Sequence, residues 1–119
     1  MITLTAEELQ YIYDKLTKAT ETEERTIEEK VLSTELHRIR EEYGIPEERA
    51  AAIAEAIISK QVFPDRNTSV GLLALLTMLE LNRVKISYTQ SELAALGNAV
   101  KDGTYRHDDI CQWILAHKS

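Results

Sequence analysis

The sequence has few residues that cross-link a chain or break its helices and strands. Its 119 residues include one cysteine, two prolines and four glycines. A lone Cys111 excludes an intramolecular disulfide and a zinc site built on cysteines, and it agrees with a reducing compartment. We expect this cysteine to be a small core residue. The length predicts one domain, residues 1–119, which can bury a core without disulfides or a structural metal.

Long apolar runs are also absent. The longest, residues 70–76, falls well short of the roughly 18 residues that a membrane-spanning helix requires. Residues 1–8 carry neither a positively charged leader nor an apolar run, so we expect no secretory signal. These absences predict a cytoplasmic protein without a membrane partner.

Positive charge is in deficit, with 14 basic against 20 acidic side chains and a net charge of -6. Residues 1–60 carry 14 acidic and 8 basic side chains, whereas residues 61–119 carry six of each. Non-specific binding to a phosphate backbone needs a basic footprint, so the composition argues against nucleic acid as a partner. The acidic first half is explained most simply as a solvated face, and alternatively as a docking surface for a basic partner.

Apolar residues recur at helical spacing along the chain, which predicts an all-α fold of five to six helices. Pairs of Thr and Glu three residues apart predict three helix starts: Thr5 with Glu8, Thr26 with Glu29, and Thr89 with Glu92. Pro46 predicts another start, and the last helix is expected at about residues 106–117. Residues 17–25 are predicted to form a loop, and residues 84–88 to be extended.

Residues 70–81 have apolar side chains on every side of the expected helix. That pattern predicts one central buried helix, around which the others pack. Pro64 predicts a turn directly before it, because the residue before a proline is pushed out of helical geometry.

This turn is the one stretch whose residues suggest chemistry. A helix N-terminus favours an anion, so Asp65 can hold Mg²⁺ there and Asn67 can bind a phosphate oxygen. The alternative is that Asp and Asn stand here as N-caps, which need no ligand.

Residues 61–69, Gln-Val-Phe-Pro-Asp-Arg-Asn-Thr-Ser, resemble the motif of the Fic/Doc (Fido) family, His-x-Phe-x-(Asp/Glu)-(Gly/Ala)-Asn-(Lys/Gly)-Arg. Phe63, Asp65 and Asn67 match it. The Leu-Thr-Ala-Glu-Glu-Leu opening, the leucine-rich segment and residues 88–96 follow the order of the short Doc-type (death-on-curing) toxins of bacterial and phage toxin–antitoxin modules.

The resemblance implies an all-α Fido fold whose loop binds Mg²⁺ and a nucleoside triphosphate. Such a domain transfers a phosphate or nucleotide group to a protein hydroxyl, in Doc-type members on a translation elongation factor, and a small antitoxin neutralises it. In the family the motif His is the general base, the acidic residue binds the metal, and the Asn and the basic residues bind phosphates.

The chain differs from the family motif at the catalytic and phosphate-binding positions. Gln61 replaces the His, and an amide cannot supply a general-base contribution of about 10²–10⁴ in rate. Thr68 and Ser69 replace the last two positions of the motif, and Arg66 replaces its small residue. Arg66 either fills the anion site or supplies the missing charge. We therefore expect transfer activity to be lost or strongly reduced; the alternative is a non-catalytic protein-interaction module that keeps the fold.

Overall fold

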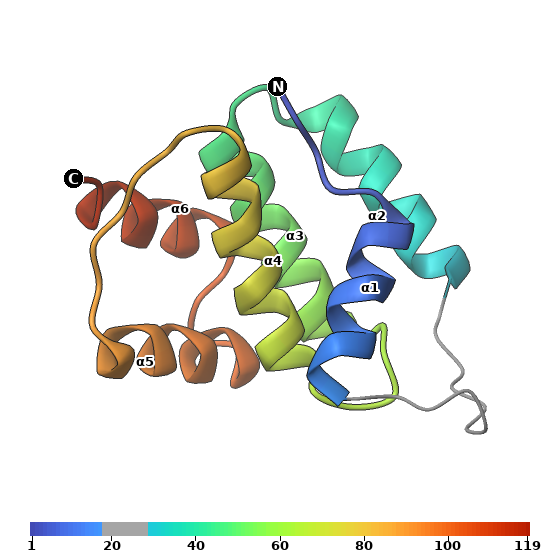
Figure 1. Ribbon diagram of the computed structural model, residues 1–119. Helices are drawn as coiled ribbons and strands as arrows, with labels where there is room; N and C mark the ends of the chain where they lie inside the picture. The colour runs from blue at the N-terminus through green and yellow to red at the C-terminus, as the bar shows by residue number, and fades with distance from the viewer. Residues whose placement is uncertain (18–28) are drawn as a thin grey trace.

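The computed structural model describes residues 1–17 and 29–119, which form six α-helices (Figure 1). They are α1 (Ala6–Thr17), α2 (Glu29–Glu42), α3 (Pro46–Lys60), α4 (Asn67–Leu81), α5 (Gln90–Lys101) and α6 (His107–Ala116). The prediction of an all-α fold of five to six helices is confirmed. Apart from Thr17, the predicted 17–25 loop lies outside the described residues, as does the helix start predicted at Thr26. No helix among the described residues is long and apolar enough to cross a membrane.

Local signals fix several of the helix ends. The Thr5 hydroxyl accepts from the Glu8 N–H at 3.2 Å, and the Glu8 carboxylate accepts from the Thr5 N–H at 2.9 Å. Thr89 and Glu92 form the same reciprocal pair at 3.1 and 2.8 Å. Pro46 is in the first turn of α3, where its missing N–H costs no hydrogen bond. These predicted helix starts are confirmed.

The most buried helix is α3 rather than α4, which corrects the prediction that residues 70–81 form the central buried helix. Nine residues of α3 are buried against six of α4, and α3 packs against α2, α4, α5 and α6. Leu73 and Leu81 of α4 remain 38% and 39% exposed. The small alanine side chains of α3 let other helices pack closely on several of its sides. The leucines of α4 raise the hydropathy of that helix, but hydropathy does not determine which helices pack against it.

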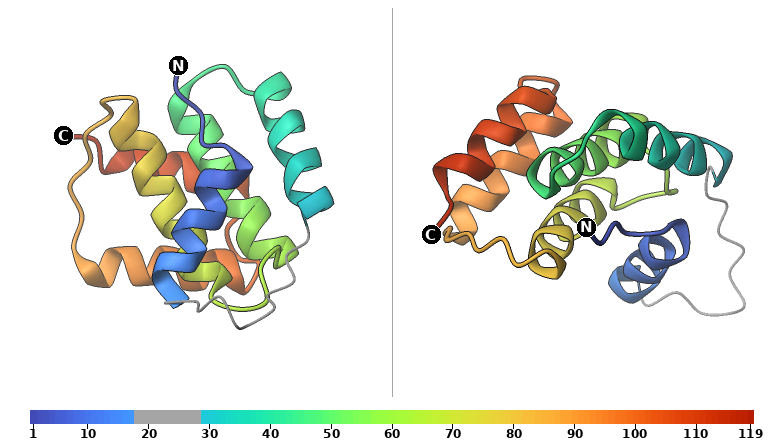
Figure 2. Two further views of the ribbon diagram at one scale, coloured as in Figure 1. Left: turned by 45° about the vertical axis from the view of Figure 1, so that its right-hand side comes forward. Right: turned by 90° about the horizontal axis from the view of Figure 1, so that it is seen from above.

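Helices α3 and α4 run side by side in the middle of the molecule, with α1 and α2 on one side and α5 and α6 on the other (Figure 2). Gly71 permits their close approach, because a Cβ there would lie 2.6 Å from Ile58 Cγ1 and 3.2 Å from the Ala54 carbonyl oxygen. A Cβ on Gly97 of α5 would lie 2.9 Å from side-chain atoms of Leu72 and Thr68. The start of α4 is therefore held closely against both α3 and α5.

Candidate functional site

The loop between α3 and α4 is bounded by two residues in the left-handed conformation. Gln61 has φ 48° directly after α3, and Arg66 has φ 56° directly before α4. Few residues other than glycine adopt this conformation, and such strain often marks functional loops. The two turns reverse the chain within a few residues and bring the predicted motif to one end of the helix pair (Figure 1).

Asn67 closes the loop with both ends of its amide. Its Oδ1 accepts from the Phe63 backbone N–H at 2.9 Å, and its Nδ2 donates to the Phe63 carbonyl at 2.9 Å. The N-cap residue of α4 is Arg66, which makes no side-chain capping bond. The alternative that Asp65 or Asn67 is the N-cap is therefore wrong: Asn67 shapes the loop instead.

Phe63 and Asp65 are tied to α1. Phe63 is buried and stacks on Tyr13, with 4.8 Å between ring centroids, and the Tyr13 hydroxyl donates to Asp65 Oδ1 at 2.9 Å. Tyr13 is fully buried in α1. A buried tyrosine commonly finds a partner for its hydroxyl, but the sequence does not say which carboxylate it meets.

A cavity of about 300 Å³ opens in front of this loop. Its walls come from the loop, from the first turn of α4, from Ile58 and from Lys101 at the end of α5. The predicted site residues that line it are Gln61, Asp65, Arg66, Asn67, Thr68 and Ser69. Phe63, also predicted, lies in the core beneath them.

Lys101 is the residue that sequence reasoning missed. It follows Gly97 by four positions, which is about one helical turn, so the close contact of α5 with α4 carries it to the cavity. Nothing local to the motif indicates this contact. With Arg66 it gives the cavity two cations, and the first turn of α4 adds no acidic residue.

A second cavity, of about 570 Å³, adjoins the first and shares Ile58, Gln61 and Lys101 with it. Lys60, Tyr105 and Arg106 also line it. Together the two cavities are lined by four basic residues and by three carboxylates. Each carboxylate accepts a hydrogen bond from within the protein: Asp65 from Tyr13, Glu55 from the His107 N–H, and Asp102 from the Thr104 N–H.

The donor set can support Mg²⁺ only together with a ligand. Asp65 is the one carboxylate that lines the 300 Å³ cavity, and no group of three potential ligands gathers anywhere in residues 1–17 and 29–119. Mg²⁺ commonly takes one or two carboxylates and completes its shell with phosphate oxygens and water. Asp65 fits that role.

No protein-family model matches the chain, and no curated protein matches it. The interpretation of this site therefore rests on the loop itself: its residues, its two tight turns and the cavity in front of it.

Proposed function

We propose that the protein is a Doc-like Fido domain that binds the phosphates of a nucleoside triphosphate at residues 61–69 and has lost most or all of its transfer activity. The supporting observation is the cavity that brings Arg66 and Lys101 together at the start of α4. Phosphate groups favour such a place, because cations and the unpaired N–H groups of a helix N-terminus act on them together.

Positive charge at the site comes from new positions. The family's basic residues are replaced by Thr68 and Ser69, while Arg66 and Lys101 line the same cavity. Arg66 is exposed and the cavity remains open beside it, which supports its role as a replacement cation rather than a plug. Asp65 would hold Mg²⁺, and the adjoining cavity beside Tyr105 offers room for the rest of the nucleotide.

Group transfer fails at Gln61. A carboxamide has no usable proton affinity, so nothing at this position removes the proton of an attacking hydroxyl. The expected loss is about 10²–10⁴ in rate, before any effect of the weaker phosphate contacts. The inherited reaction would pass a phosphate or nucleotide group to a protein hydroxyl, with an elongation factor as target and a small antitoxin as inhibitor, in the cytoplasm.

Nucleotide binding is tested by thermal unfolding with Mg²⁺ and each of ATP, GTP, CTP and UTP. At 100 times its dissociation constant, a bound nucleotide stabilises the fold by about 2.7 kcal/mol. The Lys101→Met variant should lose most of the thermal shift that the nucleotide causes. The matched variant Lys30→Met changes a lysine on α2, far from Lys101 in the sequence, and should keep that shift. No shift with any nucleotide would contradict the proposal.

Transfer is tested with labelled nucleotides and an elongation factor, with wild type and Gln61→His in parallel. We expect no label transfer by the wild type. Robust transfer by the wild type would show that Gln61 does not abolish catalysis, whereas transfer by Gln61→His alone would show that only the base was lost.

A non-catalytic interaction module is the second candidate. The side chains of Asn67 and Asp65 both bond within the protein, as they would in a loop kept for its shape alone. Binding of a protein partner without any response to nucleotides would favour this function.

A further inference from the structure

The segment after α4 is extended and has one open edge. Ser87 N–H donates to the His117 carbonyl at 2.8 Å, and Ser119 N–H donates to the Lys85 carbonyl at 3.1 Å, around an antiparallel bridge of Ile86 with Lys118. In such a pair, alternate residues direct their backbone groups to opposite edges. The Ile86 N–H and C=O therefore face away from the C-terminal residues, and they bond to no other residue in the described part of the chain.

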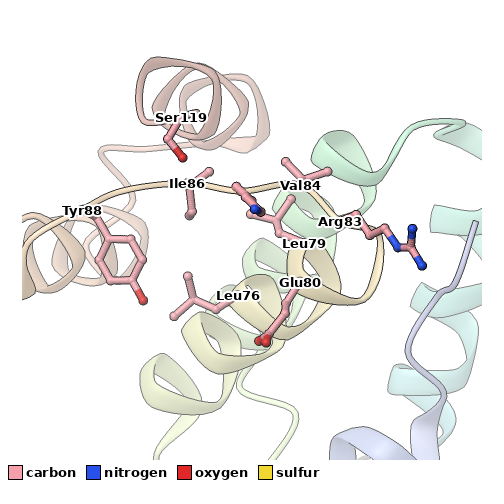
Figure 3. Close-up of a pocket in the computed structure, with 9 residues that line it drawn as sticks. Leu76, Leu79, Glu80, Arg83, Val84, Ile86, Tyr88 and Ser119 are labelled. Atoms are coloured by element: carbon pink, nitrogen blue, oxygen red, sulfur yellow. The ribbon is translucent and has the colours of Figure 1, made fainter.

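A cavity of about 550 Å³ lies between this segment and α4. The segment leaves the C-terminal end of α4 and passes close to the C-terminal residues on its way to α5 (Figure 1). Figure 3 shows Leu76, Ile86 and Tyr88 around the opening, and Leu79 and Val84 also line it. The open edge therefore borders a largely apolar hollow.

The charges beside the opening are mostly positive. Arg83 and Lys85 are exposed, and neither forms an ion pair within residues 1–17 and 29–119. Glu80 is the one acidic side chain that lines the cavity. Arg83 and Lys85 outnumber Glu80 beside the opening, and this local excess of positive charge favours a partner segment that carries acidic residues.

We propose that residues 84–88 and α4 form a docking groove for an extended, acidic peptide segment of a partner protein. The peptide adds as a strand to the edge at Ile86, where its backbone bonds to the Ile86 N–H and C=O. Alternate apolar side chains enter the cavity beside Leu76. The acidic side chains between them face solvent next to Lys85, where opposite charges on neighbouring strands attract.

The groove is at the opposite end of α4 from the nucleotide site, so it does not depend on the proposed function. Its test begins with selection of random ten-residue peptides on the intact protein, with counter-selection on Ile86→Pro, which removes the outward N–H. Ile86→Val is the matched control, because it keeps the N–H and most of the apolar side chain.

We expect enriched peptides that alternate apolar and acidic residues and bind Ile86→Pro about tenfold more weakly than Ile86→Val. Lys85→Glu should weaken binding several-fold, and added salt should weaken wild-type binding. The salt and Lys85→Glu measurements test the groove even if Ile86→Pro folds poorly. The proposal is wrong if no peptide is enriched, if the enriched peptides are basic, or if sedimentation shows a second copy of the chain occupying the edge.

Discussion

At each end of α4 an asparagine amide bonds both backbone groups of one residue, Phe63 for Asn67 and Ile2 for Asn82, but the neighbouring chain is held in different ways. At the N-terminal end, the side chain of Asn67 bonds both backbone groups of Phe63 and closes the loop. At the C-terminal end, backbone pairing with the C-terminal residues occupies one edge of residues 84–88 and leaves the other open. One end is thus closed by side-chain bonds at the proposed nucleotide site, whereas the other keeps the open backbone edge on which the proposed peptide groove rests.

The largest expected difference between the two ends is the loss of stability when a packed apolar side chain, Phe63 or Ile86, is truncated to alanine. Phe63 is 2% exposed and stacks on Tyr13, so Phe63→Ala should lower the free energy of unfolding by about 3–5 kcal/mol. Ile86 is half-buried, and Ile86→Ala should cost only about 1–2 kcal/mol. Urea denaturation measures both. Equal losses would show that the loop is no more firmly held than the extended segment.

The next comparison is between two asparagines. Asn67→Ala removes both bonds to Phe63 and leaves backbone groups in a partly buried loop, which should cost about 2–3 kcal/mol. Asn82 at the other end bonds Ile2 and the Met78 carbonyl, but closer to solvent, so Asn82→Ala should cost about 1 kcal/mol. The reverse order of stability in the same denaturation series would contradict this account of the loop.

The sequence predicts what is decided locally and misses what depends on packing. The Thr5 and Thr89 capping pairs, the Pro46 start and the turn at Pro64 are local, and each is where the sequence places it. The central position of α3 was missed because alanine contributes little to hydropathy, although its small size is what lets other helices approach. Lys101 was missed because it reaches the site through the close contact of α5 at Gly97.

A smaller contrast concerns two tyrosine hydroxyls. Tyr13→Phe keeps the stack on Phe63 but removes the hydrogen bond to Asp65, which should cost about 1 kcal/mol. Tyr88→Phe is the matched control at the other end, because the Tyr88 hydroxyl makes no hydrogen bond to any residue that the structure describes; its effect should be near zero. A loss at Tyr88 equal to that at Tyr13 would mean that the Asp65 bond does not stabilise the loop.

The smallest expected effect is a pH dependence of stability, and it involves only His117 and Glu92, on the side of the molecule where the C-terminal residues pair with residues 84–88. His117 Nδ1 lies 2.7 Å from the Trp113 carbonyl and Nε2 lies 3.1 Å from Glu92 Oε2. Both nitrogens face acceptors, which suits the protonated ring, so first the Trp113 carbonyl and then Glu92 raise the pKa of His117 above its ordinary value. The pKa of Glu92 is lowered, first by the Thr89 backbone N–H and then by His117.

A raised His117 pKa makes its stabilising contribution complete below about pH 6.5 and lost as pH rises through the folded-state value. The lowered Glu92 pKa adds a contribution that is complete above its ordinary value and lost at lower pH. Stability from this pair should therefore be greatest between about pH 4.5 and 6.5. Since the pair is near the surface, we expect only a slight fall in Tm between pH 6 and 8, and a smaller one in His117→Gln.

Hydrogen exchange tests whether this pH dependence is local. Because the His117 carbonyl accepts from the Ser87 amide, exchange of that amide should quicken between pH 6 and 8, after correction for its intrinsic pH dependence. Exchange of the Phe63 amide in the loop should not quicken. Equal quickening at both amides would show that the two ends of α4 respond to pH as one unit.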